Sequence, residues 1–299
     1  MAVKPQHFEP RQYMRSDTYE VFLYKDAYLK EVALHHHDFY EVYFFLSGNV
    51  RYIIESRSYL LTPGDILLIS PMELHQPMFQ PEQRSYARIV LWINRRFLES
   101  MVSPDYNLTA CFNTSAPDHS NLLQPDSSLR QLLDFQLRQL IAESDAADHY
   151  SSLAGLTYLT QILINLNRLS ARSHSHSESI LPADSVVYRV LNYINTHYSE
   201  NLTLNDLANQ FFISKYHLSR EFGRVVGTSV HRYLIQKRLV MAKQMMRQGM
   251  SSTEVYQHCG FGDYSNFYRA FKAEYHITPK EFLARLRQPV PDAPGMFSR

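Results

Sequence analysis

Hydrophobic residues follow a period of two in the N-terminal part of this 299-residue chain. Over residues 20–93, short runs rich in Tyr, Phe, Ile and Val alternate with polar residues, and turn-forming residues interrupt the runs at 47–49, 62–65 and 70–71. Short alternating runs separated by Gly, Pro, Asn and Ser are typical of antiparallel strands. The pattern predicts an antiparallel β-barrel or sandwich.

Two longer stretches, 126–143 and 148–172, have the period of an amphipathic helix. The apolar stripe of the first consists of Leu129, Leu132, Leu133, Leu140 and Ile141, and that of the second of Leu156, Leu159, Ile162, Leu163 and Leu166. These helices can pack on each other as a hairpin within one chain or form the interface of a dimer. The Ser-rich residues 173–184 are unsuited to a core and are predicted to be a linker.

Two similar segments near the C-terminus, 204–225 and 253–272, each predict a short helix, a turn and a second helix. They share one spacing of apolar and basic residues, Leu218, Arg220 and Phe222 in the first and Phe267, Arg269 and Phe271 in the second. Ser214 and Asp263 are favourable N-caps for the second helices, because a side-chain oxygen can accept a hydrogen bond from an amide of the first turn. The duplication favours two helix-turn-helix units over a helical bundle with solvated charges.

One face of each second helix is left for a partner once the apolar residues are buried. That face carries Lys215, Tyr216, Ser219 and Arg220 in the first unit and Tyr264, Ser265, Tyr268 and Arg269 in the second. In the major groove of DNA, Arg can pair with guanine, and Tyr or Ser can form hydrogen bonds or contact thymine methyl groups. These eight residues are the predicted DNA-binding set.

The distribution of charge agrees with this interpretation. Residues 185–288 contain 14 Lys and Arg against 7 Asp and Glu, whereas the rest of the chain contains 16 against 22. A basic third suits contacts to phosphates, which supply much of the non-specific affinity for DNA. A solvated basic face is the alternative that charge alone leaves open.

Residues 186–287 resemble the DNA-binding domain of the AraC/XylS-type transcription regulators. The resemblance rests on Leu207-Ala208, Ser214-x-x-x-Leu218-x-Arg220-x-Phe222, Gly227, Gly260-Phe261-x-Asp263, Phe267-x-Arg269-x-Phe271-Lys272 and Thr278-Pro279-x-x-Phe282. It implies that a long helix over 230–248 joins the two units and holds the recognition helices about one DNA turn apart. Tyr256 and His276 depart from the small residue and the Gly that the family usually has there.

The N-terminal region resembles the cupin superfamily, and so the sensor domain that such regulators commonly carry. His35, His37 and Glu41 followed by Gly48 match its first motif, and Pro63-Gly64-Asp65 with Pro71-x-x-x-His75 match its second half. His35, His37 and Glu41 share strand parity and are expected to point inward, whereas His36 is expected to be exposed. With His75 they form a candidate metal site. The regulatory members imply an organic ligand instead, and therefore no cofactor or metal.

An organic effector needs a few polar groups placed among aromatic rings. The candidates are His37, Glu41, Tyr43, His75, Arg88 and Trp92. Arg88 can pair with a carboxylate or with sugar hydroxyls, and Trp92 can stack on a sugar ring. Ordinary core packing is the alternative for Tyr43 and Trp92. A sugar is the effector that the family resemblance favours.

Composition limits the remaining possibilities. The length suggests about two domains, and Cys111 and Cys259 lack the spacing of a zinc or redox site. No apolar run has the ~20 residues of a membrane helix, and the N-terminus lacks a signal-peptide core, so a cytoplasmic protein is expected. The predicted domains are a sensor barrel at 1–120, a helical dimerisation segment at 121–172, a linker at 173–184, a double helix-turn-helix domain at 185–288 and a tail at 289–299.

Together these features predict an α+β multidomain protein, with a cupin-like antiparallel barrel and helical hairpin followed by an all-α DNA-binding domain. We expect a homodimeric, sugar-responsive transcription activator that binds promoter DNA and contacts RNA polymerase. The alternatives are a metal-dependent cupin enzyme or metal sensor fused to a DNA-binding domain, and a constitutive DNA-binding protein whose barrel only dimerises.

Overall fold

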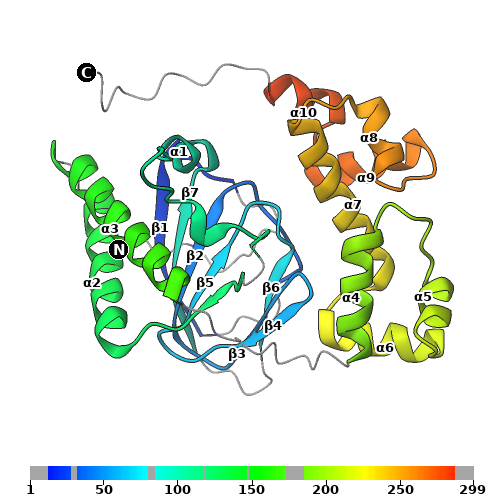
Figure 1. Cartoon of the computed structure of the whole chain (residues 1–299), viewed down its shortest axis with the longest axis horizontal. Coiled ribbons are helices and arrows are strands. Elements are labelled where there is room, and N and C mark those ends of the chain that lie inside the picture. The colour runs from blue at the N-terminus through cyan, green and yellow to red at the C-terminus, as the bar shows by residue number, and fades with distance from the viewer. Residues whose placement is uncertain are drawn as a thin grey trace. The chain divides into compact units, whose positions relative to one another are not determined.

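The computed structural model describes residues 13–27, 32–79, 85–116, 119–146, 148–172 and 185–286 (Figure 1). The predicted linker at 173–184 and the tail at 289–299 lie outside these residues. The chain divides into two compact units, 1–188 and 189–299, and each is described by itself. Within the described residues, no helix is both long enough and apolar enough to cross a membrane.

Two antiparallel sheets build the N-terminal unit. The larger has the strand order β1 (Tyr19–Asp26), β7 (Tyr86–Ile93), β2 (Tyr40–Ser47), β5 (Ile66–Ile69) and β8 (Leu122–Leu123), and the smaller has the order β4 (Arg57–Leu60), β3 (Val50–Ile54) and β6 (His75–Phe79). The predicted antiparallel β domain is confirmed. Its described strands form two separate hydrogen-bonded sheets and not one closed barrel.

Strand β2, in the larger sheet, is buried on both faces. Along β2, Tyr43 and Phe45 join a core that includes Tyr52 of the smaller sheet, whereas Val42 and Phe44 join a second core beneath the helices. Because successive strand residues point to opposite faces, β2 supplies both cores in alternation. This explains why its sequence is apolar at almost every position.

Helices α2 (Ser127–Asp145) and α3 (Ser151–Arg172) pack on each other and cover the outer face of the larger sheet, where α2 contacts β1 (Figure 1). Their bounds lie within three residues of the predicted ones. Leu133, Leu137 and Leu140 of α2 are buried. Leu132 was expected in the buried stripe and is 43% exposed, because it lies about 100° around the helix from Leu133.

Short elements connect these parts, namely α1 (Arg95–Ser100) and the 3-10 helix η1 (Ala110–Phe112). The pattern of apolar residues did not predict either. Asn94 caps α1 by accepting hydrogen bonds from the amides of Arg96 and Phe97. Elements as short as α1 and η1 contain too few residues to show a helical period in the sequence.

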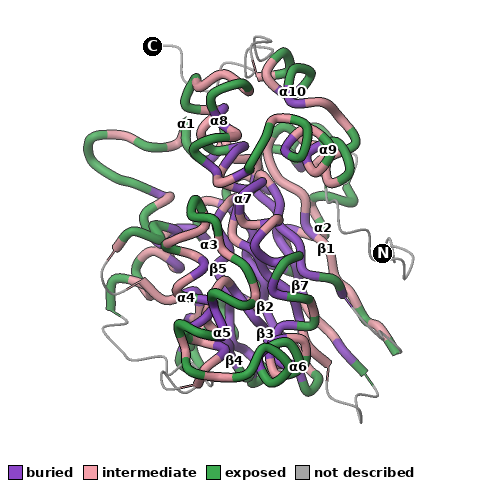
Figure 2. The backbone as a smooth tube through the Cα atoms, turned by 90° about the vertical axis from the view of Figure 1, so that its right-hand side faces the viewer, coloured by how far each residue is buried: buried purple, intermediate pink, exposed green. Residues whose placement is uncertain are grey.

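The described part of the C-terminal unit is helical, as predicted. It contains α4 (Val186–His197), α5 (Leu204–Gln210), α6 (Lys215–Val226), α7 (Val230–Arg247), α8 (Ser252–His258), α9 (Tyr264–Tyr275) and α10 (Pro279–Leu286). The pairs α5/α6 and α8/α9 are the two predicted helix-turn-helix units, and α7 is the long helix expected between them. Figure 2 shows buried backbone along α7 and exposed backbone at the outer turns.

The predicted caps of the second helices are confirmed. Ser214 accepts a hydrogen bond from the amide of His217 at 3.2 Å, and Asp263 accepts one from the amide of Asn266 at 2.7 Å. His276 ends α9 in the left-handed conformation with a φ of 56°, which a polar residue tolerates at a cost. The departure from Gly at this position therefore does not change how the helix ends.

The loop at 198–200 contacts both α7 and the turn of the second helix-turn-helix unit. The guanidinium of Arg238 on α7 donates hydrogen bonds to the carbonyl oxygens of Tyr198 at 2.8 Å and Glu200 at 2.7 Å. On the other side Gly260, in the turn between α8 and α9, lies so close that a Cβ there would be 2.6 Å from the Ser199 carbonyl oxygen. The turn of the second unit thus rests on a loop that α7 holds in place.

Candidate functional site

The predicted DNA-binding residues of the first unit lie on one exposed face of α6. Leu218 and Phe222 are fully buried on the opposite side. Lys215, Tyr216, Ser219 and Arg220 are all exposed, and Tyr216 is 78% exposed. The structure therefore brings these four side chains together on one exposed surface of α6.

The second unit presents its residues differently. Ser265 and Arg269 on α9 are exposed, whereas Tyr264 and Tyr268 are half-buried. The ring of Tyr264 packs edge-on against Tyr256, with the ring centroids 5.9 Å apart. The large residue at Tyr256 is thus accommodated by a contact with the start of the recognition helix, which leaves less of Tyr264 for a partner.

Phe212 is a surface feature that the sequence reasoning missed. It lies in the turn between α5 and α6, is 95% exposed and has a φ of 55°. Left-handed backbone is easiest for Gly, and a bulky residue there is an outlier. The signal was present in the adjacent pair Phe211 and Phe212, because a tight turn has room to bury only one of two such neighbours.

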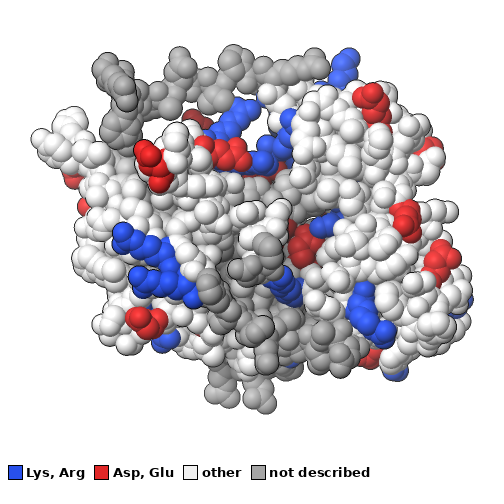
Figure 3. All heavy atoms as spheres, viewed as in Figure 1, with Lys and Arg blue, Asp and Glu red and all other residues white. Residues whose placement is uncertain are grey.

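Charge is dispersed over the one face of the molecule that Figure 3 draws. On the face drawn in Figure 3, Lys and Arg side chains lie singly or in small groups among Asp and Glu. On α6, Arg224 and Glu221 form an ion pair at 2.7 Å, and both are on the helix that carries Arg220.

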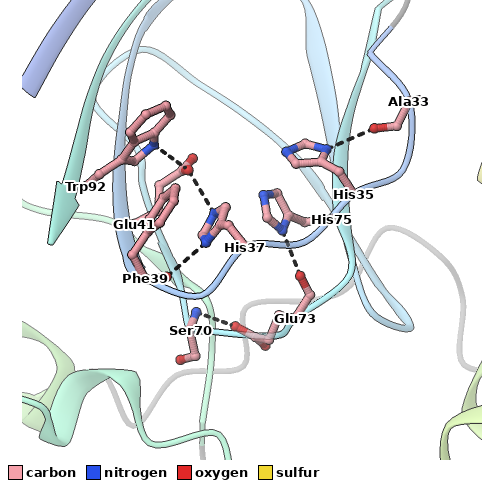
Figure 4. Close-up of polar contacts among 9 residues, drawn as sticks. All are labelled: Ala33, His35, His37, Phe39, Glu41, Ser70, Glu73, His75 and Trp92. Atoms are coloured by element: carbon pink, nitrogen blue, oxygen red, sulfur yellow. Dashed lines mark hydrogen bonds and ion pairs between the residues drawn. The ribbon is translucent and has the colours of Figure 1, made fainter. Parts of the chain in front are cut away.

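A second candidate site lies in the interior of the N-terminal unit (Figure 4). Glu41 on β2 and Trp92 on β7 are cross-strand partners, and the Trp92 indole N–H donates a hydrogen bond of 3.0 Å to the Glu41 carboxylate. Nε2 of His37 lies 3.1 Å from the same carboxylate oxygen. The predicted inward orientation of these residues is therefore seen in the structure.

His35 and His75 complete this cluster. Their backbones form an antiparallel bridge, and their ring centroids are 4.2 Å apart. Burial lowers the pKa of His35 to about 4 and that of His75 well below its usual value. Both rings are consequently neutral at pH 7. The ligand atoms of His37, Glu41 and His75 all lie within 4.8 Å of one another.

His36 is buried, contrary to the expectation from strand parity. Residues 36–38 are not part of a strand, and the only pairing at this point is the isolated bridge at His35. An alternation of inward and outward side chains holds only within an extended strand. The expectation from strand parity therefore does not apply to His36.

Arg88 already has a carboxylate partner. Its guanidinium forms an ion pair with Asp26 and lies over the rings of Tyr86 and Tyr24, at 4.1 and 4.5 Å from their centroids. The hydroxyl of Tyr86 is hydrogen-bonded to that of Tyr43, and burial raises the pKa of Tyr86 to about 12. Tyr43 and Trp92 belong to the core between the sheets, so packing is at least part of their role.

Two family models match the chain. An AraC-like ligand binding domain matches residues 19–163, and a helix-turn-helix domain matches residues 207–285. The chain is 24% identical over 248 residues to the HTH-type transcriptional activator RhaS of Escherichia coli O157:H7. The aligned region covers 83% of this chain and 86% of that protein.

Solved structures with similarity to the chain include two bacterial proteins. One is ToxT of Vibrio cholerae bound to an unsaturated fatty acid, with 16% identity, coverage of 90% of this chain and 97% of that one, and a TM-score of 0.39. The other is the C-terminal domain of the response regulator AraT of Geobacillus stearothermophilus, with 25% identity, coverage of 37% and 92%, and a TM-score of 0.34.

The matched domains and the relative RhaS belong to transcription regulators and not to enzymes, which excludes the cupin-enzyme alternative. The order of the two matched regions is also that of the two structural units. The chain belongs to the AraC/XylS family of transcription regulators, with an N-terminal ligand-binding domain followed by a helix-turn-helix domain that binds DNA.

Proposed function

We propose that this protein activates transcription from a promoter that it reads with α6 and α9, in response to a sugar bound inside its N-terminal unit. The observation that carries the DNA-binding part is the division of each recognition helix into a buried and an exposed face. The eight predicted residues all lie on α6 and α9, and Arg220 and Arg269 are exposed at equivalent positions. The name of the relative RhaS, a transcriptional activator, supports activation of transcription and not repression.

The ion pair at Arg88 favours a neutral effector. A carboxylate ligand at Arg88 would also meet the negative charge of Asp26, which already pairs with this guanidinium. A polyhydroxylated ligand can instead donate to Asp26 and Glu41 and accept from Arg88 and tyrosine hydroxyls. Aromatic faces beside such groups are the usual surroundings of a bound sugar ring. His37, Tyr43, His75 and Trp92 complete the proposed effector set.

Exposed apolar side chains on α2 and α3 support a homodimer. Leu132 and Phe135 of α2 and Leu153 of α3 are exposed, although their neighbours cover the sheet. Large exposed apolar residues on adjacent helices are commonly part of an interface. In this proposal residues 121–172 dimerise, 173–184 link the two units, and the protein acts in the cytoplasm with RNA polymerase as a further partner.

DNA binding is tested with Arg220→Ala and Arg269→Ala. If both side chains read guanine, each variant loses about 1–3 kcal/mol on the specific promoter site and much less on random DNA. Arg285→Ala is the matched control, because Arg285 is an exposed arginine of the same domain that lies on α10 and is not part of either recognition helix. Equal losses on specific and random DNA would show that the two arginines contact only phosphates.

Effector binding is tested with the fluorescence of Trp92, the single tryptophan of the chain. A sugar that binds beside Glu41 changes the surroundings of the indole and shifts its emission. The same sugar at 100 times its Kd stabilises the folded protein by about 2.7 kcal/mol. A panel of neutral sugars that changes neither the emission nor the Tm, while an organic acid changes both, would contradict the proposal.

A further inference from the structure

The turns of the two helix-turn-helix units are closed by the same backbone hydrogen bond. In the first unit the amide of Phe212 donates to the carbonyl oxygen of Asn209 at 3.2 Å. In the second the amide of Gly260 donates to the carbonyl oxygen of Gln257, also at 3.2 Å. Both donors have left-handed backbone, with φ of 55° and 76°. Phe212 therefore occupies in the first unit the position that Gly260 occupies in the second.

An aromatic residue is unfavourable at this position. Left-handed backbone costs an L-residue free energy that Gly does not lose. Phe212 is 95% exposed, so burial of its ring does not offset that cost. The neighbouring Phe211 is half-buried and packs edge-on against Tyr193, with the ring centroids 5.8 Å apart. Strained backbone that packing does not explain is found mainly at functional sites, and Phe212 is such a case.

Phe212 lies close to the end of α6 that a DNA groove receives. It precedes Lys215, the first residue of α6, by three positions. Three residues span at most about 11 Å of extended chain, and the major groove is about 12 Å wide. Recognition helices place their N-terminal residues at the base edges. When Lys215 and Tyr216 face the bases, Phe212 therefore lies in the groove or at its wall.

The charge around Phe212 favours a nucleic acid as the partner of its ring. Residues 207–220 contain no Asp or Glu, and they include Lys215, His217 and Arg220. Basic side chains without acidic neighbours are attracted to the phosphates of DNA. In the major groove an aromatic ring can contact the C5-methyl group of thymine, which is the apolar feature that distinguishes this base.

We propose that Phe212 packs against the C5-methyl group of a thymine at the edge of the sequence that α6 reads. The inference rests on the proposed function, because it requires α6 to enter the major groove. It adds a base-reading residue that lies in the turn to the eight that lie on the recognition helices. Gly260 has no side chain at the equivalent position, so this contact exists only in the part of the DNA site bound by the first unit.

Replacement of thymidine by deoxyuridine is the probe, because it removes the methyl group and keeps the base pair. The wild-type full-length protein first selects its preferred duplex from random DNA, and each thymine of that duplex is then replaced singly. We expect one replacement, beside the bases that face α6, to weaken wild-type binding about fourfold, the effect of leaving one methyl-sized group unburied.

Phe212→Gly should bind the thymine and deoxyuridine duplexes equally at that position. Gly and Asn both tolerate left-handed backbone, so Phe212→Gly and Phe212→Asn are expected to fold and should lose the preference alike. Phe212→Tyr retains the ring and should retain the preference. Tyr106→Ala is the matched control, because Tyr106 is an exposed aromatic residue of the N-terminal unit, and it should keep the wild-type preference.

Arg220→Ala in the same assay separates this inference from the proposed function. If Arg220→Ala loses specific binding while Phe212→Gly keeps the fourfold preference, the inference is overturned and the proposed function stands. An equal loss by Phe212→Gly on specific and random DNA would also overturn it, because the ring would then contact the sugar-phosphate backbone. Unchanged DNA binding with lost promoter activation would assign the ring to a protein partner instead. A wild-type protein that selects no sequence would overturn both proposals.

Discussion

Gly260→Ala is expected to destabilise the C-terminal unit strongly. The added Cβ would lie 2.6 Å from the carbonyl oxygen of Ser199, 2.8 Å from its carbonyl carbon and 2.8 Å from the carbonyl oxygen of Tyr198. These are backbone atoms, and the guanidinium of Arg238 holds this loop through two hydrogen bonds to its carbonyl oxygens. The loop therefore has little freedom to move away.

Two costs add to give the magnitude. The φ of Gly260 is +76°, and an L-residue in left-handed backbone costs about 1–2 kcal/mol. Forcing an extra methyl group into a packed site costs about 1–3 kcal/mol more. We expect the free energy of unfolding to fall by about 2–5 kcal/mol, a large part of the 5–15 kcal/mol typical of a whole domain.

Urea denaturation followed by circular dichroism measures this loss, and Gly262→Ala is the matched control. A Cβ at Gly262 would meet no atom within 4 Å, so that variant should stay within about 0.5 kcal/mol of wild type. Gly260→Ala should also weaken promoter binding, because relief of the clash moves the start of α9. A stability loss no larger than that of Gly262→Ala would refute the tight contact between this turn and the 198–200 loop.

Three further predictions concern single side chains. Gly223→Ala should raise the free energy of unfolding by about 0.5–1 kcal/mol in the same urea assay, because Gly223 lies inside α6 with open space around its Cβ position; a loss of stability would mean that the site is more crowded. Phe212→Gly should leave stability unchanged or raise it by up to about 1 kcal/mol, since the backbone of Phe212 is left-handed and its side chain is exposed, and a clear loss by thermal denaturation would show that the ring packs on something. Burial and the charge of Arg57 lower the pKa of His119 to about 4, so the unfolded chain binds a proton more readily between pH 6.5 and 4 and stability falls as the pH falls through that range. The Tm of His119→Gln should fall less than that of wild type over this range, and identical pH profiles would contradict the assignment.

Local sequence signals determined most of the helical domain. The N-caps Ser214 and Asp263, the repeated apolar spacing and the long stripe of α7 act over four to twenty residues, and such short-range patterns are visible in a single sequence. Alternation likewise predicted an antiparallel β domain. The same alternation failed at His36, because a parity argument presumes a strand and the chain bends there into an irregular segment with one bridge.

The tertiary structure decided how the strands and polar groups are combined. Whether the described strands close into a barrel or form two sheets depends on which edges pair, and the sequence does not encode these long-range pairings in any local pattern. The partner of Arg88 is Asp26, 62 residues away, and the neighbours of His75 come from the segment at 35–41. Composition and spacing identify residues capable of binding DNA, a sugar or a metal. Which of them face one another, and which atoms are left without a partner, is set by packing contacts between segments distant in the chain.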